Sequence, residues 1–295
     1  MDWNDLRFVL AVSRDKTLAA AGKTLRVDPT TVGRRIVAIE AELGARLFDR
    51  TGDGYLLTPA GRIATAKAEE MELTTLSLAQ QVQDSDGQAA GLVRLASTDS
   101  LIDEIIVPAL PKLLSKYPAL EVSVSSGHKI LSIPRREVDV AVRFLKPTEP
   151  DTIGRKLGCE ALAAYCAVGL DATEQTPLIG MAKELGENPL TRIYDTTFPG
   201  RPIAVGATAE SSARNLTRAG MGISILTCHT GDSDPALKRA LPQIVAKFDL
   251  WAVVHEDLHK TPRIQAVLDF LTEVFRENED LLAGRCPLAR NEVAQ

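Results

Sequence analysis

The chain has 295 residues, of which 45% are hydrophobic, and its 34 Lys or Arg against 39 Asp or Glu give a formal net charge of −5. This length predicts two domains, each large enough to form its own hydrophobic core. No stretch approaches the ~18 apolar residues of a membrane span, the N-terminus is acidic, and the four cysteines form no C-x-x-C pair. We therefore expect a cytoplasmic protein with reduced thiols, no membrane partner and no zinc site.

Residues 17–50 predict two short helices joined by a tight turn. The first helix, Thr17 to Leu25, is rich in alanine, which lets a neighbouring helix approach closely. Asp28 is a good N-cap for the second helix, and Pro29 suits its first position. Apolar residues at spacings of four and three then predict the buried face of this helix: Val32, Ile36 and Ile39.

Hydroxyl and guanidinium groups lie away from this buried face. Arg can bind guanine or phosphate, and Thr can contact a base edge or a thymine methyl group. Residues 14–50 carry eight basic against five acidic side chains, so the basic charge is regional and the acidic total does not exclude nucleic acid. The groove-facing candidates are Pro29, Thr30, Thr31, Arg34 and Arg35; the alternative is a solvated helix without a partner.

The next segment carries a recognisable motif. Glu40 to Arg50 reads E-x-E-L-G-x-x-L-F-x-R, a glycine-rich turn follows, and Leu57 to Gly61 reads L-T-x-A-G. This run resembles the LysR-type transcriptional regulators. The resemblance implies a winged helix-turn-helix DNA-binding domain at residues 1–58, with Arg50 on phosphate or in the minor groove.

Two positions depart from the family pattern. Gly33 stands where the family commonly has Ser, so one phosphate contact is expected to be absent. Asp53 stands at the wing tip, where a basic residue is usual and where a phosphate would repel a carboxylate. Arg50 is therefore the expected wing contact, and the preferred DNA site is expected to differ from the usual family pattern.

Residues 59–86 predict one long helix with a heptad seam of apolar or small residues: Ala64, Ala68, Met71, Thr75, Leu78 and Val82. The spacing alone leaves open whether the seam pairs with a second chain or packs on its own domain. The resemblance favours antiparallel pairing, which implies a dimer or tetramer and an operator with approximate two-fold symmetry. Small and polar residues at 87–91 predict a hinge.

From residue 92 to 290, strands alternate with helices, which predicts an α/β domain with a largely parallel sheet. The expected strands are Leu92–Ala96, Leu120–Ser125, Val138–Phe144, Ala161–Val168, Ile203–Gly206, Gly222–Leu226 and Trp251–His255. The expected helices are Ser100–Lys116, Ile130–Arg136, Ser211–Arg218 and Pro262–Phe275. The resemblance implies a two-lobed effector domain like a periplasmic binding protein, with lobe I at 92–160 plus 266–290 and lobe II at 161–265.

Ligands of such sheets bind outside the carboxyl ends of the strands. The residues there, and hence the effector-binding candidates, are Ser97, Thr98, Ser100, His128 and Arg143. Each has a structural alternative: residues 97–100 cap the following helix, His128 is a surface loop residue, and Arg143 pairs with Asp139 or Asp151. Asp99 argues against an anionic effector, because it adds negative charge at the same helix N-terminus.

Other chemistry has weaker support. His255 and His259 have a metal-like spacing, but they run into Thr261-Pro262, which favours a surface connection. Cys159 and Cys166 could form a redox pair, yet they lack the cationic surroundings of reactive thiols, which favours buried structural cysteines. Because there is no P-loop, no G-x-S-x-G elbow and no dinucleotide fingerprint, we expect neither an enzyme nor a bound cofactor.

The resulting prediction is an α+β multidomain, homo-oligomeric transcriptional regulator. It has a winged helix-turn-helix, a long linker helix and a two-lobed α/β effector domain. The implied partners are double-stranded DNA, a small-molecule effector, other copies of the chain, and RNA polymerase. The alternative is a cytoplasmic small-molecule binding module whose helical domain serves protein association.

Overall fold

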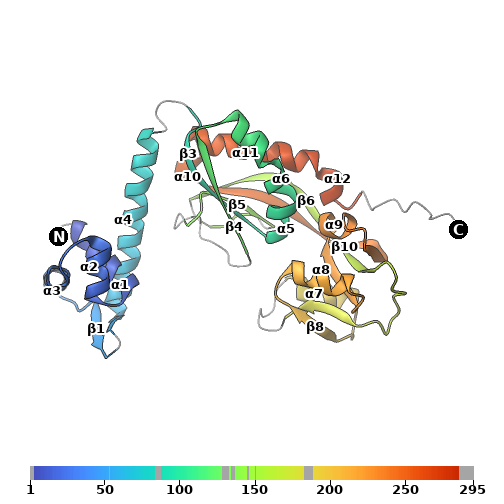
Figure 1. Cartoon of the computed structure of the whole chain (residues 1–295), viewed down its shortest axis with the longest axis horizontal. Helices are drawn as coiled ribbons and strands as arrows, with labels where there is room; N and C mark the ends of the chain where they lie inside the picture. Colours follow the sequence, from blue (N-terminus) through green and yellow to red (C-terminus); the bar gives the residue numbers. More distant parts are fainter. Residues whose placement is uncertain are drawn as a thin grey trace. The chain divides into compact units, whose positions relative to one another are not determined.

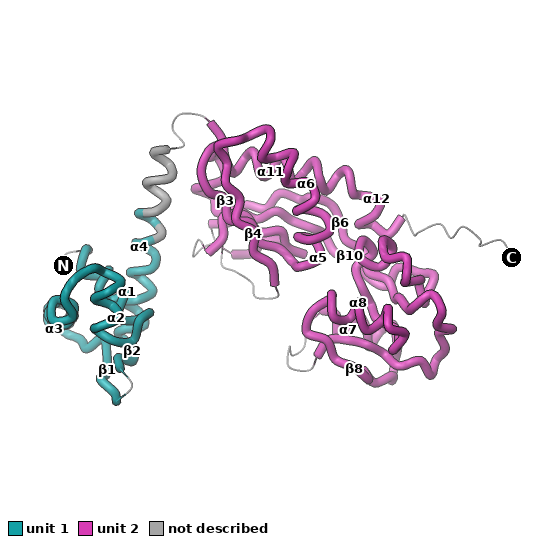
Figure 2. The backbone as a smooth tube through the Cα atoms, viewed as in Figure 1, with its two compact units in different colours: residues 1–83 teal, residues 84–295 magenta. Residues whose placement is uncertain are grey.

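The computed structural model describes residues 3–52, 54–83, 88–127, 133, 137–144, 146–149, 151–182 and 189–285, excluding the side chains of residues 3, 73 and 76–83. The chain forms two compact units, residues 1–83 and 84–295 (Figure 2). The expected short helix at 130–136 and the candidate His128 lie outside the described residues, apart from Ile133.

Unit 1 consists of helices around a small core and a hairpin of two antiparallel strands (Figure 1). Its elements are a 3-10 turn (Trp3–Asp5), α1 (Leu6–Asp15), α2 (Leu18–Leu25), α3 (Pro29–Leu43), β1 (Phe48–Thr51), β2 (Gly54–Leu57) and α4 (Pro59–Gln83). Both helices of the expected helix-turn-helix are present.

Side-chain caps begin both helices of this motif. Thr17 Oγ1 accepts a hydrogen bond from the backbone N–H of Ala20 at 3.1 Å, which starts α2. Asp28 Oδ1 accepts one from the N–H of Thr30 at 2.8 Å, so the expected Asp28 cap of α3 is confirmed. The predicted buried face of α3 is also confirmed, because no residue in it is more than 3% exposed: Val32, Ile36 and Ile39.

The E-x-E-L-G motif joins the end of α3 to the wing. Glu40 Oε1 accepts hydrogen bonds from the backbone N–H groups of Leu47 at 2.7 Å and Phe48 at 3.2 Å. Thr58 Oγ1 donates to the carbonyl of Arg46 at 2.7 Å and accepts from the N–H of Gly61 at 2.9 Å. These bonds fix the hairpin between α3 and α4.

The first half of the predicted heptad seam packs on its own unit. Ala68 is buried in the unit 1 core, and Ala64 is partly buried against it. An ion pair of 2.7 Å between Arg14 Nη2 and Glu72 Oε2 links α1 to α4 as well. Met71 is 39% exposed. The seam residues Leu78 and Val82 lie outside the described side chains.

Unit 2 is built on one sheet with the strand order β4-β3-β5-β10-β6-β9-β7-β8. The strands are β3 (Gly91–Ser97), β4 (Leu120–Ser126), β5 (Val140–Arg143), β6 (Thr152–Ala167), β7 (Leu178–Met181), β8 (Ile203–Ala207), β9 (Ile223–Thr227) and β10 (Leu237–His255). Parallel pairing holds within β4-β3-β5 and within β9-β7-β8, whereas β6 and β10 pair antiparallel with their neighbours. The sheet is therefore mixed rather than largely parallel.

Two long strands connect the lobes. β6 and β10 pair with each other from Thr152↔His255 to Ala167↔Leu237, with bulges. β5 pairs with the end of β10 in lobe I, and β9 pairs with the end of β6 in lobe II. The sequence prediction of strands only at 161–168 and 251–255 was wrong in extent, because pairing between segments far apart in sequence extends both strands.

Helices cover this sheet in both lobes. They are α5 (Asp99–Leu101), a π-helical segment (Ile102–Ile106), α6 (Val107–Lys116), α7 (Pro189–Thr197), α8 (Glu210–Arg218), α9 (Cys228–Asp232), α10 (Glu256–His259), α11 (Pro262–Glu277) and α12 (Glu279–Leu282). The first three form one continuous stretch, as predicted for residues 100–116. α7, α9, α10 and α12 were not predicted from the sequence.

Lobe I, comprising the β3-β4-β5 half with α11, holds the largest core of unit 2. Leu95 and Val140 of the sheet pack there with Ile106, Val267 and Leu271 of the helices. Lobe II, the β7-β8-β9 half, has two smaller cores. Within the described part of the chain, none of the helices combines the length and hydropathy needed to cross a bilayer.

Candidate functional sites

The outward face of α3 is the first candidate site. Thr30 and Arg34 are exposed, and Thr31 is half-buried. Thr30 Oγ1 donates to Asp28 Oδ1 at 2.6 Å; this bond and the Thr30 N–H hold the pKa of the Asp28 carboxyl below its usual range. The cap therefore stays ionised at the start of α3 and fixes the position of Thr30.

The two arginines of α3 have different surroundings. Arg35 Nη1 lies 2.9 Å from Asp5 Oδ1, and its guanidinium lies 5.9 Å from the centroid of the Phe8 ring. Arg34 is exposed and has no ion-pair partner among the described residues. Arg34 is thus available to a ligand, whereas Arg35 links α3 to the N-terminal turn.

The wing carries the second basic group of this site. Arg50 lies on β1 opposite Tyr55 of β2, and its guanidinium is 5.4 Å from the centroid of that ring. This contact holds an exposed cation beside the hairpin turn. Asp53, which the sequence analysis expected at the wing tip, lies outside the described residues.

One residue of the α3 face was not among the sequence candidates. Val37 is 57% exposed and lies three residues after Arg34, about one helical turn along the same side of α3. An exposed valine there can contact a thymine methyl group. The sequence offered one signal for Val37, because it lies outside the buried stripe of α3. Only polar and charged side chains, together with Pro29, were predicted as DNA contacts.

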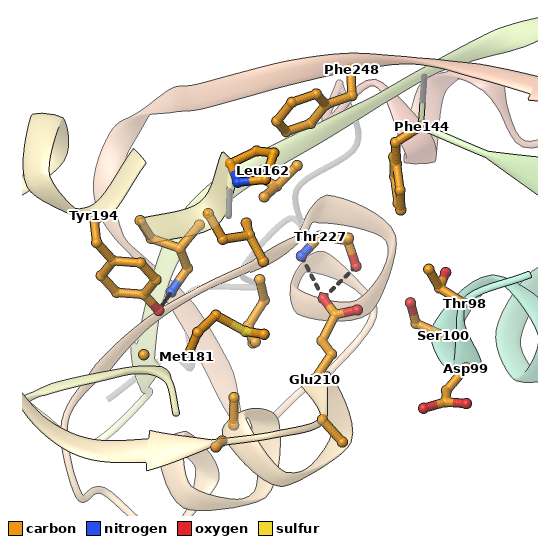
Figure 3. A pocket seen from close by; sticks show the side chains of 18 residues that line it. Thr98, Asp99, Ser100, Phe144, Leu162, Met181, Tyr194, Glu210, Thr227 and Phe248 are labelled. Atoms are coloured by element: carbon orange, nitrogen blue, oxygen red, sulfur yellow. Dashed lines mark hydrogen bonds between the residues drawn. The ribbon is translucent and has the colours of Figure 1, made fainter. Parts of the chain in front are cut away.

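The second candidate site is a cavity of about 410 Å³ between the two lobes of unit 2 (Figure 3). Lobe I contributes Thr98, Asp99, Ser100 and Phe144, and the crossover strands contribute Leu162 and Phe248. Lobe II supplies the rest of the wall, including Met181, Leu190, Tyr194, Glu210, Ile225 and Thr227. Its position at the carboxyl end of β3 is where sheets of this kind bind ligands.

The structure brings two of the five predicted effector-binding residues to this cavity, Thr98 and Ser100. Ser97 is buried, and its hydroxyl donates to the carbonyl of Val142 at 3.2 Å. Arg143 Nη1 forms an ion pair of 2.7 Å with Glu149 Oε1, so the expected structural pairing occurs with a partner that was not foreseen. Neither Ser97 nor Arg143 lines the cavity, and His128 lies outside the described residues.

The wall from lobe II was missed by sequence reasoning. Tyr194 on α7 is its clearest member: its hydroxyl donates to the carbonyl of Ile179 at 2.5 Å and accepts from the N–H of Ile225 at 2.7 Å. Burial raises the pKa of Tyr194, so the hydroxyl stays protonated. Its two hydrogen bonds join β7 and β9. Its ring remains as a flat apolar wall (Figure 3).

Glu210, the first residue of α8, adds a carboxylate to the cavity. Its Oε1 accepts hydrogen bonds from both the N–H and the hydroxyl of Thr227, each at 2.7 Å. Asp99 adds a second carboxylate from lobe I. No basic side chain belongs to the described lining of this cavity.

Polar contacts also join the lobes beside the cavity. Glu104, in the π-helical segment of lobe I, accepts hydrogen bonds from Arg214 of α8 at 2.5 Å and from the hydroxyl of Thr230 at 3.2 Å. His229 Nδ1 lies 2.9 Å from Glu160 Oε2 of β6, and both side chains are fully buried. A change in the lobe arrangement would therefore disturb the ion pair between Glu104 and Arg214.

The residues considered for redox or metal chemistry lie apart from this cavity. Among the described residues Cys159, Cys166 and Cys228 form no disulfide, and burial raises the pKa of the Cys228 thiol to about 11. His255 caps α10 by accepting from the N–H of Asp257 at 3.2 Å, and His259 ends this one-turn helix, which the sequence analysis had taken for a connection. Among the described residues, no group of three or more His, Cys, Asp or Glu is placed to hold a metal ion.

Sequence models of two protein families match the chain. Residues 3–62 match the bacterial regulatory helix-turn-helix protein, lysR family, and residues 86–276 match the LysR substrate binding domain. The chain is 25% identical over 289 residues to the Mau operon transcriptional activator of Paracoccus denitrificans, covering 96% of this chain and 99% of that protein. It is 23% identical over 293 residues to the regulator DmlR of Escherichia coli, covering 93% and 95%.

Solved structures show the same fold. Full-length CbnR in complex with its target DNA has a TM-score of 0.66 at 21% identity, covering 94% of this chain and 99% of that one. A full-length OxyR variant from Pseudomonas aeruginosa has a TM-score of 0.64 at 16% identity, covering 98% and 100%. The expected combination of a helix-turn-helix unit and an α/β unit is thereby confirmed.

Proposed function

Because the chain belongs to the LysR family of DNA-binding transcriptional regulators, we propose that it binds its operator through the outward face of α3 and the wing. Thr30, Thr31 and Arg34 read the major groove, Pro29 lies at the entry of α3, and Arg50 contacts phosphate or the minor groove. Arg35 acts by holding α3 against the N-terminal turn.

The exposure of Arg34 on a helix whose opposite face is buried is the observation that carries this proposal. An exposed guanidinium with no ion-pair partner in the described part of the chain keeps its donors for guanine or phosphate. Arg35 is the next residue in the chain, but its guanidinium forms an ion pair of 2.9 Å with Asp5. The two neighbours are therefore assigned different roles.

We assign the DNA-binding domain to residues 1–58, the linker and dimerisation helix to 59–86, the hinge to 87–91 and the effector domain to 92–290. The boundary between the two compact units after residue 83 supports this division, as do the limits of the two family matches. The linker helix pairs with a second chain beyond its contacts with α1, giving a dimer or tetramer on a two-fold-related operator.

The cavity between the lobes is proposed as the effector site. Support comes from Thr98 and Ser100, whose hydroxyls line it. Ser97 and Arg143 are not part of the described lining and bond to Val142 and Glu149 instead. The effector binds two arrangements of the molecule with different affinities. It therefore favours one of them and changes how much of the operator is occupied. The site of action is the cytoplasm, and RNA polymerase is the further partner at the promoter.

The test is capture of genomic fragments by the purified full-length protein over a salt titration, followed by sequencing. We expect enrichment of fragments that share a two-fold-related motif, with affinity falling steeply as salt rises. Arg34→Ala is expected to weaken specific binding by about 1–3 kcal/mol. Lys112→Ala removes an exposed charge from unit 2 and is the matched control.

Unchanged operator affinity of the Arg34→Ala variant would remove Arg34 from the groove-facing set. Failure to retain any fragment at low salt would overturn the assigned role of α3 and would favour the binding-module alternative. Analytical ultracentrifugation of the same protein tests the oligomer, and a monomer at the concentrations that bind DNA would contradict the paired linker helix.

A further inference from the structure

The cavity between the lobes has an apolar side and a polar side. Phe144 and Phe248 lie edge to face, with ring centroids 6.1 Å apart, and Leu162 and Tyr194 continue the apolar wall (Figure 3). Thr98, Asp99 and Ser100 of lobe I form the polar side together with Glu210 of lobe II. A ligand that fills this space needs an apolar body and a polar end.

The polar side has hydrogen-bonding capacity that the protein does not use. Thr98 Oγ1 and Ser100 Oγ are buried and have no hydrogen-bond partner among the described residues. Ser100 is only 9% exposed, so its hydroxyl is largely withdrawn from solvent. Buried hydroxyls are rarely left unpaired, and these two line a cavity, which indicates that a ligand completes their hydrogen bonding.

The charge on this side is negative. In the described part of the chain neither Asp99 nor Glu210 has an ion-pair partner, and the described lining includes no basic side chain. Glu210 uses Oε1 for Thr227, which leaves its other oxygen available. The buried His229 does not line the cavity and is already engaged with Glu160.

The amino end of α5 faces the same space and by itself would favour an anion. Asp99, in the first turn of that helix, offsets this partial positive charge, which amounts to roughly half an elementary charge. Glu210 adds a full negative charge from the facing lobe. The balance of the described groups therefore disfavours a carboxylate or phosphate ligand and favours a cation.

We infer that the effector is a small cationic molecule with an apolar body: a protonated amine between Asp99 and Glu210, hydrogen-bonded to Thr98 and Ser100, with an aromatic or branched aliphatic group against Phe144 and Phe248. A cavity of about 410 Å³ is within the usual size range of small-molecule sites. This inference rests on the proposed effector role of the cavity. It adds the chemical class of the ligand.

The experiment compares three probes of similar size with the purified full-length protein: 2-phenylethylamine, 2-phenylethanol and 3-phenylpropanoate. Binding is measured by calorimetry at neutral pH, where the amine is protonated and the acid is ionised. We expect the amine to bind about tenfold or more tightly than the alcohol, as charge-assisted hydrogen bonds predict. The carboxylate is expected to bind more weakly than both.

Two near-isosteric variants test the carboxylates. Glu210→Gln keeps an acceptor for Thr227, and Asp99→Asn keeps the shape of the first turn; each is expected to weaken amine binding about tenfold. Each is expected to leave alcohol binding within about twofold, which reports an intact cavity. Glu273→Gln, on the exposed face of α11, is the matched control and keeps wild-type affinity for all three probes.

Three results would overturn the inference: tighter binding of the carboxylate than of the amine, equal binding of amine and alcohol, or no binding of any probe at millimolar concentration. DNA binding is measured on the same preparations. If the protein still binds its operator but gives any of these three results, only the inference of a cationic ligand is wrong. Loss of operator binding in the wild type is a separate failure, that of the proposed regulator function.

Discussion

His229 and Glu160 face each other with 2.9 Å between Nδ1 and Oε2, and neither side chain is exposed to solvent. Glu160 lies on β6, where this strand passes from one lobe to the other, and His229 lies on α9. His229 Nε2 and Glu160 Oε1 are buried without a hydrogen-bond partner among the described residues. The crossover between the lobes therefore contains a buried titratable pair.

This pair makes the stability of unit 2 depend on pH. Burial lowers the pKa of His229, but the hydrogen bond and charge of Glu160, with the charges of Glu210 and Glu104, outweigh it and raise the pKa above its ordinary value. Burial also raises the pKa of Glu160. The raised pKa of His229 favours the imidazolium in the folded state, so its contribution to stability is complete below the ordinary histidine pKa of about 6.5 and is lost as pH rises through the raised value. The raised pKa of Glu160 acts in the same direction, starting from the ordinary value of that carboxyl, 4.5.

We therefore expect the melting temperature of unit 2 in the full-length protein to fall as pH rises above neutrality. His229→Gln is expected to flatten this slope and to cost about 1–3 kcal/mol at pH 6. Thermal denaturation from pH 6 to 9 measures both effects. His259→Gln removes a histidine outside the pair and is expected to keep the wild-type slope; an unchanged slope in the His229 variant would contradict the assignment.

The ion pair between Glu104 and Arg214 joins the two lobes and is expected to stabilise their arrangement. Its side chains are only 26% and 28% exposed, so Glu104→Gln leaves a guanidinium that is largely withdrawn from water. We expect this change to lower the free energy of unfolding of unit 2 by about 1–3 kcal/mol.

Urea denaturation of the full-length protein measures this loss. Glu277→Gln is the matched control, because it breaks the exposed Glu277–Lys112 pair and is expected to cost less than about 1 kcal/mol. Equal losses in the two variants would show that the Glu104–Arg214 pair contributes no more than an ordinary surface pair.

Arg35 and Asp5 are expected to act together in positioning α3. Since the Arg35 side chain is 49% exposed, loss of the ion pair should cost less than about 1 kcal/mol of stability in unit 1. Its effect on DNA binding is more informative. If Arg35 only positions α3, Asp5→Asn should reproduce most of the loss of DNA affinity seen for Arg35→Ala. The loss in the double variant should then be smaller than the sum of the two single losses.

A filter-binding titration of the two single variants and the double variant measures this coupling. Affinity lost by Arg35→Ala but retained by Asp5→Asn would instead show that Arg35 contacts DNA directly.

Gly22 and Gly33 are expected to respond in opposite directions to a change to alanine. A Cβ on Gly22 would lie 2.8 Å from the carbonyl oxygen of Val27, where α2 meets the turn before α3. We expect Gly22→Ala to destabilise unit 1 by about 1–3 kcal/mol, because backbone must move. A Cβ on Gly33 would lie 3.3 Å from Leu18 Cδ1, the end of a flexible side chain.

Gly33→Ala should therefore be neutral or stabilising by up to about 1 kcal/mol, the difference in helix propensity. Urea denaturation followed by circular dichroism compares the two variants directly. A Gly22→Ala protein as stable as the wild type would show that the turn before α3 is less tightly packed than the structure indicates.

The local signals of the sequence predicted unit 1 closely. Asp28, Pro29 and the spacing of Val32, Ile36 and Ile39 act within a few residues of one another, so the start of α3 and its buried face follow from nearby chemistry. The partner of Arg35 was not predictable in this way, because Asp5 is 30 residues away and no local pattern connects them.

The strands of unit 2 show where local reasoning stops. β3, β4 and β8 were predicted to within one residue at each end, since their apolar runs are bounded by turns. The first half of β6 and most of β10 were missed. Residues 152–160 contain glycines and charges that predict no strand. Only their pairing with β10, from Thr152↔His255 to Glu160↔Phe248, makes them one.

The sequence alone determined the family, the helix-turn-helix, the groove-facing candidates on α3 and the position of Thr98 and Ser100 after the first strand of unit 2. These depend on motifs and short spacings, in which each residue acts on near neighbours. Only the tertiary structure decided that Arg35 is held by Asp5, that Arg143 pairs with Glu149 away from the cavity, and that Tyr194 and Glu210 complete its wall. Arg143 and Glu149 are six residues apart, but no helical or strand spacing connects them. The other contacts join segments far apart in the chain, and no local pattern records which distant side chains the packed lobes bring together.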